Sequence, residues 1–236
     1  MAQWSDNPGM IGIRSLLFHI ASVLVTLVFL PLYPLILAPF RVGWPVLRSY
    51  VHAQLWLLRT ICGQTYEIEE NGNLPDGPCI LASRHEALWE TLVLPILLDN
   101  PAVILKEEIF RYPLAGRIAR KLDYIGVDRG GSTERTKATF DAARQAAADG
   151  RRVLIFPGGT RNPDHRFRVQ GGVVVLYRAL KLPCVPIVLN SGDFWPHGSW
   201  NRCPGVIRIR VLPAIPPGLR SNDFLAQLTQ ELAMPA

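Results

Sequence analysis

Short apolar runs alternate with stretches of helical periodicity from residue 65 to the end of the chain. Apolar residues spaced three or four apart are typical of helices, whereas short continuous apolar runs are typical of buried strands. The predicted strands are residues 66–68, 79–82, 102–105, 124–127, 153–156, 184–189 and 206–212. The predicted helices are residues 88–98, 114–121, 133–148 (capped by Ser132), 172–180 and 223–232. This alternation predicts an α/β fold in which a largely parallel mixed sheet is flanked by helices.

The N-terminal quarter of the chain has a different pattern. No Asp, Glu, Lys or Arg occurs between Arg14 and Arg41, and residues 16–30 are almost wholly apolar. A helix over residues 15–30 would be about 24 Å long, which is shorter than the hydrocarbon core of about 30 Å. Prolines follow at positions 31, 34 and 39. The pattern predicts a membrane-associating helix that either spans the bilayer as a kinked segment reaching Phe40 or dips into one leaflet.

Residues 42–62 form the next predicted helix, in which apolar residues at near-helical spacing are interleaved with basic ones. Its basic and neighbouring residues are Arg41, Arg48, His52 and Arg59. Such a helix either lies in an anionic membrane interface or packs on a soluble core, and the pattern leaves both open. Arginines that follow an apolar segment favour the cytoplasmic side. We therefore expect a membrane-associating helical segment over residues 1–62 and an α/β domain over residues 63–236, at the cytoplasmic face of the membrane.

The charge balance indicates an anionic partner. The chain has 25 Lys and Arg against 19 Asp and Glu, which gives a formal net charge of +6. No run of consecutive basic residues is longer than the pair Arg151-Arg152, so we expect no nucleic-acid partner and favour a phosphorylated metabolite or an acidic membrane surface. The 4 cysteines form no C-x-x-C pair, which argues against a zinc ribbon or a disulfide framework and favours a reducing compartment.

Polar and charged residues follow four of the predicted strands at the point where each ends. They are Arg84-His85, Lys106, Asp128-Arg129 and Gly158-Gly159-Thr160-Arg161. If these strands are parallel, the four groups share one edge of the sheet, where open α/β sheets bind ligands. The cations suit a phosphorylated substrate because guanidinium groups match phosphate oxygens. Each residue alone also suits a structural role, such as an ion pair, but their joint placement favours a binding site.

His85 and Glu90 are candidates for a general base and the carboxylate that orients it. Positions five apart on an ideal helix point about 140° away from each other, so the two side chains cannot meet if both residues are helical. They can meet if His85 lies in the turn before a helix that starts around Glu86 or Ala87. The stretch does not match the zinc motif H-E-x-x-H, because Trp89 occupies the second histidine's place. The chain also has neither a G-x-S-x-G nucleophile elbow nor a phosphate-binding P-loop motif.

These motifs, in this order, resemble the glycerolipid acyltransferase family, and within it the bacterial 1-acyl-sn-glycerol-3-phosphate acyltransferases, over about residues 65–219. The four family motifs are matched at residues 85–90, 106–109 with 126–129, 156–161 and 185–187. In the first motif, H-x-x-x-x-D, Glu90 stands in place of the aspartate. In the third, F-P-E-G-T-R, Gly158 stands in place of the glutamate.

The resemblance implies an acyltransferase that transfers an acyl group from an acyl thioester to the sn-2 hydroxyl of 1-acyl-sn-glycerol-3-phosphate, forming phosphatidic acid in phospholipid biosynthesis. His85 would take the hydroxyl proton, and Glu90 would fix the imidazole tautomer. The residues expected to bind the substrate phosphate are Lys106, Arg129, Thr160 and Arg161. Gly158 and Gly159 would shape the substrate loop.

The resemblance also implies the partners: a lysophospholipid, acyl-CoA or acyl carrier protein as the acyl donor, and the bacterial inner membrane. We expect neither a cofactor nor a metal. Because Gly158 replaces the family's glutamate, two alternatives stay open. The acceptor is another lysolipid, such as a lyso-ornithine lipid, or the protein is a non-catalytic relative that binds anionic lipid.

Overall fold

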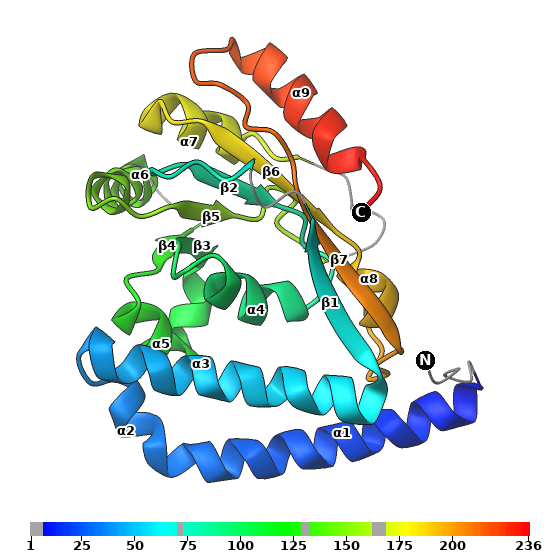
Figure 1. Ribbon diagram of the computed structural model, residues 1–236. Helices are drawn as coiled ribbons and strands as arrows, with labels where there is room; N and C mark the ends of the chain where they lie inside the picture. The colour runs from blue at the N-terminus through cyan, green and yellow to red at the C-terminus, as the bar shows by residue number, and fades with distance from the viewer. Residues whose placement is uncertain (1–6, 70–72, 129–132, 162–168) are drawn as a thin grey trace.

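The computed structural model describes residues 7–69, 73–128, 133–161 and 169–236. Strands in these residues form a seven-stranded sheet of order β1-β7-β6-β2-β5-β3-β4 (Figure 1). The strands are β1 (Gln64–Glu69), β2 (Ile80–Ser83), β3 (Ala102–Lys106), β4 (Ile125–Val127), β5 (Val153–Ile155), β6 (Cys184–Leu189) and β7 (Gly205–Val211). Every neighbouring pair is parallel except β6 and β7, which are antiparallel. The predicted α/β fold with a largely parallel mixed sheet is confirmed.

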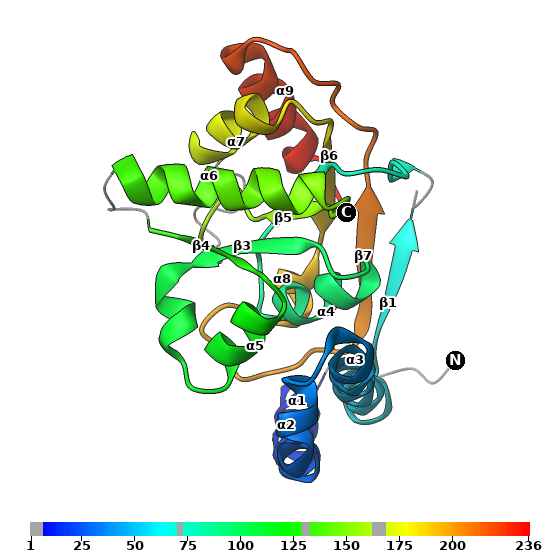
Figure 2. The same ribbon diagram turned by 90° about the vertical axis from the view of Figure 1, so that its left-hand side faces the viewer.

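Helices cover both faces of this sheet (Figures 1 and 2). α4 (Trp89–Leu97) and α5 (Ala115–Lys121) lie on one face, and α6 (Thr133–Ala148), α7 (Gly172–Leu180) and α9 (Ser221–Ala233) on the other. Side chains of β2 alternate between the two apolar clusters: Leu81 packs with the first group of helices, and Ile80 packs with the second. The central strands are therefore buried on both faces, which explains why β6 is a continuous apolar run in the sequence.

The first helix, α1 (Pro8–Phe29), begins earlier than the start at Ser15 from which we estimated its length. The Asn7 side chain accepts a hydrogen bond from the Gly9 N–H at 2.9 Å, and Pro8 occupies the first turn, so the helix has a favourable start there. Its 22 residues reach about 33 Å, which is enough for a hydrocarbon core of about 30 Å. The length estimate from the sequence was wrong because it began after the last charged residue, Arg14, rather than at the cap.

After α1, the chain turns through a 3-10 segment (Leu30–Leu32) and α2 (Tyr33–Ile36), and α3 (Phe40–Leu57) runs back along α1 (Figure 1). A π-helical turn over Leu58–Cys62 leads to β1. Trp44, Val51 and Leu57 of α3 are buried in the same apolar cluster as Trp89 of α4. The N-terminal helices therefore share a core with the sheet, and a domain boundary at residue 62 stays a prediction.

The outward side of α1 is covered by apolar side chains, which we call the apolar face of α1. They are Ile13, Leu16, Leu17, Ile20, Val23, Leu24, Leu27 and Val28. Each is between 47% and 70% exposed. Among the described residues, the stretch Pro8–Ile36 is the one helical segment long and apolar enough to cross a membrane. A row of large apolar side chains that are about half exposed is typical of a surface that associates with a membrane.

Candidate active site

His85 lies in the loop between β2 and α4, and its Nδ1 lies 3.0 Å from Oε1 of Glu90. α4 begins at Trp89, so the predicted start around Glu86 or Ala87 was wrong. The backbone N–H groups of Glu86 and Ala87 donate to Glu90 Oε1 at 2.6 and 2.7 Å. The carboxylate therefore satisfies N–H groups that precede the helix, as capping side chains do, and keeps His85 in an irregular loop.

The Glu90 carboxylate is fully buried and is held at both oxygens. Its Oε2 accepts a hydrogen bond of 2.7 Å from the hydroxyl of Ser191, a fully buried residue that opens α8 (Ser191–Phe194). Sequence reasoning did not single out Ser191. It follows β6, the parallel neighbour of β2, so the rule about strand ends that selected His85 also applies to it.

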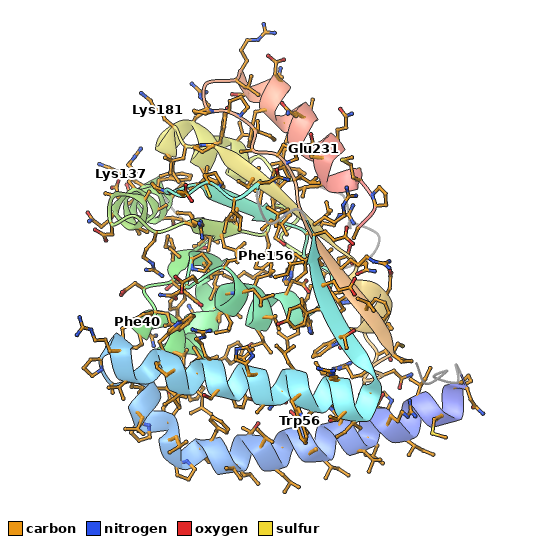
Figure 3. The ribbon with its side chains drawn as sticks, in the orientation of Figure 1. Phe40, Trp56, Lys137, Phe156, Lys181 and Glu231 are labelled. Atoms are coloured by element: carbon orange, nitrogen blue, oxygen red, sulfur yellow. The ribbon has the colours of Figure 1, made fainter. Side chains whose placement is uncertain are left out.

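The contact with Glu90 determines which nitrogen of His85 faces the substrate. Because a carboxylate only accepts hydrogen bonds, we assign the proton to Nδ1, and Nε2 keeps a free lone pair. The ring also stacks on Phe156, with centroids 4.4 Å apart and an angle of 29° between the planes. Phe156 follows β5, on the other side of β2, and lies near the middle of the molecule (Figure 3). Residues that follow both neighbouring strands therefore fix the imidazole: Phe156 contacts the ring directly, and Ser191 holds the carboxylate of Glu90 that binds it.

A cavity of about 730 Å³ opens beside this imidazole. Four of the predicted site residues line it together with His85: Lys106, Gly159, Thr160 and Arg161. Apolar side chains cover much of the remaining wall, including Ile104, Phe140 and Leu176. Lys106 and Arg161 are exposed, and neither side chain forms an ion pair or hydrogen bond with the described part of the chain. The cavity thus offers a base, two cations and an apolar wall.

Two predicted site residues lie elsewhere. Arg129 lies outside the described residues, so its expected role stays a prediction. Gly158 is not among the residues that line the cavity, and its carbonyl accepts a hydrogen bond of 2.9 Å from the side chain of Gln170. The Gln170 N–H also donates to the Pro157 carbonyl at 3.0 Å. Gln170 therefore holds the loop over residues 157–159, although no charge or motif in the sequence distinguishes it.

Gly159 has a φ of 65°, in the left-handed region where other residues are disfavoured. Its N–H donates to the Phe156 carbonyl at 3.0 Å, which closes a tight turn directly after the strand. The same turn carries Thr160 and Arg161 to the cavity. A glycine at this position is therefore required by the backbone of the substrate loop.

Arg84, the neighbour of His85, does not line the cavity. Its buried guanidinium donates to the carbonyls of Leu232 and Met234, near the C-terminus, and lies 3.8 Å from the Glu86 carboxylate. The Glu86 carboxylate in turn accepts from the Gly192 N–H at 3.1 Å. Arg84 therefore connects the end of α9 to the loop that holds the candidate base.

The thiols are poorly suited to nucleophilic catalysis. Burial raises the pKa of Cys62 and of Cys79 to about 11, and it raises the pKa of Cys184 further. None of the 4 cysteines lines the cavity. Since the thiolate is the reactive form, the site favours chemistry by a general base.

A family model described as Acyltransferase matches residues 65–190, which include the candidate base, the substrate loop and β6. The chain is 31% identical over 227 residues to the 1-acyl-sn-glycerol-3-phosphate acyltransferase of Pseudomonas aeruginosa, covering 93% of this chain and 87% of that protein. It is 25% identical over 202 residues to the 1-acyl-sn-glycerol-3-phosphate acyltransferase of Limnanthes alba, covering 83% and 70%.

A solved structure has the same fold. The crystal structure of the 1-acyl-sn-glycerophosphate (LPA) acyltransferase PlsC from Thermotoga maritima superimposes with a TM-score of 0.71 at 19% sequence identity. The match covers 94% of this chain and 93% of that chain. The likeness in fold therefore includes most of the N-terminal helices as well as the sheet.

Proposed function

Since this chain belongs to the acyltransferase family, we propose that it transfers an acyl group from an acyl thioester to the sn-2 hydroxyl of 1-acyl-sn-glycerol-3-phosphate and so forms phosphatidic acid. One observation carries the proposal: an oriented imidazole stands at the wall of a cavity that also contains two exposed cations. A hydroxyl acceptor needs the base, and a phosphate needs the cations.

The transfer follows from the position of His85 Nε2. This nitrogen accepts the hydroxyl proton as the hydroxyl oxygen bonds to the thioester carbonyl carbon. The carbon–sulfur bond then breaks, and the departing thiolate takes the proton back from Nε2. A thiolate with a pKa of about 8.5 leaves with little acid assistance. Glu90 holds the Nδ1 proton and stabilises the imidazolium between these steps, and no acyl-enzyme is formed.

Lys106, Thr160 and Arg161 are assigned to the phosphate of the acceptor, because they line the cavity on the same side of the sheet as His85. We assign Arg129, which follows β4 in the sequence, to the same role. The proposed donor is acyl-CoA or acyl carrier protein, and the reaction as written requires neither a metal nor a cofactor.

We further propose that α1 lies in one leaflet at the cytoplasmic face of the inner membrane rather than spanning the bilayer. α1 is bound to the rest of the protein along its length: Ser15 accepts from the Arg202 N–H at 2.8 Å, and Thr26 contacts Tyr50 of α3 at 3.2 Å. A spanning helix would carry these protein neighbours into the hydrocarbon core. In the leaflet, the apolar face of α1 meets lipid, and substrates with acyl chains stay out of water.

The proposal is tested with purified full-length protein, labelled acyl thioesters and a panel of lysolipids that includes lysophosphatidate and a lyso-ornithine lipid. We expect transfer to lysophosphatidate, and a loss of about 10²-fold to 10⁴-fold or more in the variant His85→Ala. Arg178→Ala, an exposed change on α7, serves as the matched control. Near-normal turnover of His85→Ala would overturn the role of the base. Transfer to the lyso-ornithine lipid alone would replace the acceptor, and lipid binding without any transfer would favour the non-catalytic alternative.

A further inference from the structure

α3 has one face that packs on the protein and one that does not. Its exposed side carries a row of residues spaced three or four apart, which we call the basic stripe. The basic stripe consists of Arg41, Pro45, Arg48, His52 and Trp56 of α3, and it continues to Arg59 in the π-helical turn that follows. Because the opposite face is buried against α1 and α4, the helix cannot rotate, and the stripe is presented in one fixed direction.

The charge of the basic stripe is not neutralised by any residue that the structure describes. The sequence contains no Asp or Glu between Asp6 and Glu67. Arg41, Arg48 and Arg59 form no ion pair with any described residue. Three arginines thus lie along about 27 Å of helix without counter-charges. Such an arrangement favours binding to an extended anionic surface.

The apolar face of α1 indicates which anionic surface this is. α1 and α3 run side by side (Figure 1), joined by contacts such as that between the rings of Phe29 and Tyr50, 5.5 Å apart. Trp56, on the exposed side of α3, is 63% exposed. Exposed apolar residues next to a tryptophan and arginines are typical of a protein surface that meets both the hydrocarbon core and the lipid head groups.

We propose that the basic stripe binds anionic lipid head groups and makes membrane attachment selective for surfaces that contain them. The inference rests on the proposed membrane setting but not on catalysis. An unpaired basic residue near an anionic surface strengthens binding about fivefold, so the three arginines together contribute about a hundredfold. The stripe also fixes how the molecule is rotated about α1, because α3, which carries the stripe, lies along one side of α1 only.

The test measures co-flotation of full-length protein with vesicles of phosphatidylcholine, with and without phosphatidylglycerol. The variant R41Q/R48Q/R59Q removes the charge of the stripe. The control R144Q/R178Q/R220Q removes the same charge from α6, α7 and the residue before α9, at the opposite end of the molecule (Figure 1). We expect the stripe variant to lose about a hundredfold in partitioning to the anionic vesicles only, with an effect that weakens in high salt.

Three results would overturn the inference. The first is wild-type partitioning of the stripe variant. The second is an equal loss in both triple variants, because net charge alone would then explain the binding. A third is a loss of activity that appears only with acyl carrier protein as donor while partitioning is unchanged, because the stripe would then bind an acidic protein. Partitioning of His85→Ala separates this inference from the proposed function, since that variant should bind vesicles normally even if it transfers nothing.

A second and independent observation concerns Ser191. Its hydroxyl donates to Glu90 Oε2 at 2.7 Å, on the carboxylate oxygen that does not contact His85, and both residues are fully buried. We infer that Ser191 is a positioning residue that acts through Glu90 on the imidazole of His85. Without this hydroxyl, one oxygen of a buried carboxylate loses its partner, and the carboxylate can turn away from the ring.

Ser191→Ala should lower kcat about 10-fold to 100-fold while KM for both substrates changes less than about twofold, because a hydrogen bond to a charged group is lost but no substrate contact is. Ser191→Thr, which keeps the hydroxyl, should restore most of the rate. In the background of Glu90→Gln, the same Ser191→Ala change should cost little more. An unchanged kcat, or an equal loss in both backgrounds, would refute the positioning role. Inactive Ser191→Ala with active His85→Ala would instead refute the proposed function.

Discussion

Replacing Glu90 by aspartate tests whether the reach of this carboxylate sets the activity. An aspartate is shorter by one methylene, so its carboxylate would lie up to about 1.5 Å nearer to the α4 backbone. The distance of 3.0 Å between the carboxylate and His85 Nδ1 would then grow to about 4.5 Å, beyond hydrogen-bonding range. The N–H groups of Glu86 and Ala87, now 2.6 and 2.7 Å away, would lose their acceptor as well.

The loss of a hydrogen bond to a charged group costs about 1.5–3 kcal/mol, and each 1.4 kcal/mol on the barrier is about tenfold in rate. We therefore expect Glu90→Asp to lower kcat by about 10-fold to 150-fold. Leaving buried N–H groups without an acceptor costs about 1–3 kcal/mol each, so the free energy of unfolding should fall by about 2 kcal/mol or more.

Steady-state kinetics and urea unfolding measure the two effects in the same preparation. Glu67→Asp, at an exposed position on β1, also removes one methylene and should change neither kcat nor the free energy of unfolding. A wild-type kcat in Glu90→Asp would refute the expectation that the reach of the carboxylate sets the activity. The loop over residues 84–88 would then follow the shorter side chain, and the geometry would be less rigid than the hydrogen bonds indicate.

Three further predictions use other parts of the structure. Gly159→Ala should lower the free energy of urea unfolding by about 1 kcal/mol or more, because the φ of Gly159 is 65°. Gly158→Ala, at a residue whose φ is not positive, should change it little. Equal effects of the two changes would contradict backbone strain at position 159. Arg84→Met should lower the unfolding free energy by about 3–5 kcal/mol, since it removes the buried guanidinium that lies 3.8 Å from the buried Glu86 carboxylate, and a wild-type melting curve would refute this. Burial raises the pKa of Cys62 and Cys79 from 9.0 to about 11, so the stability from these protonated thiols is present below pH 9 and is lost as the pH rises through 11. Replacing both by alanine should flatten the dependence of the unfolding free energy on pH in that window, and an unchanged slope would contradict the assignment.

Elements whose signals are local in the sequence were predicted well. The bounds of α6, α7 and β6 agree with those predicted from periodicity, and no end of the other predicted elements of the α/β part differs by more than two residues. Central strands buried on both faces give uninterrupted apolar runs, and helices give three- and four-residue spacing, so tertiary contacts reinforce the local pattern.

Parts of the site that depend on long-range hydrogen bonds were not predictable in the same way. The loop over residues 84–88 is not helical because Glu90 captures its N–H groups, and the second carboxylate oxygen is held by Ser191, 101 positions away. Gln170 reaches the Gly158 carbonyl through a neutral amide that no motif marks. By contrast, the position of Lys106 and Arg161 at the cavity was predictable, because parallel strands bring their ends to one edge of the sheet whatever the conformation of the loops.

The pairing of the two ends of the chain has a consequence for how the protein is made. β1 lies at the edge of the sheet with β7 as its neighbour, and Ser15 of α1 bonds to Arg202. A ribosome that adds about 5–20 residues per second therefore needs on the order of ten seconds to supply these partners. During that time α1 and α3 have emerged, but β7 and Arg202 do not yet exist. The nascent chain is thus expected to meet the bilayer before the sheet closes, and assembly of the active site would be completed on the membrane.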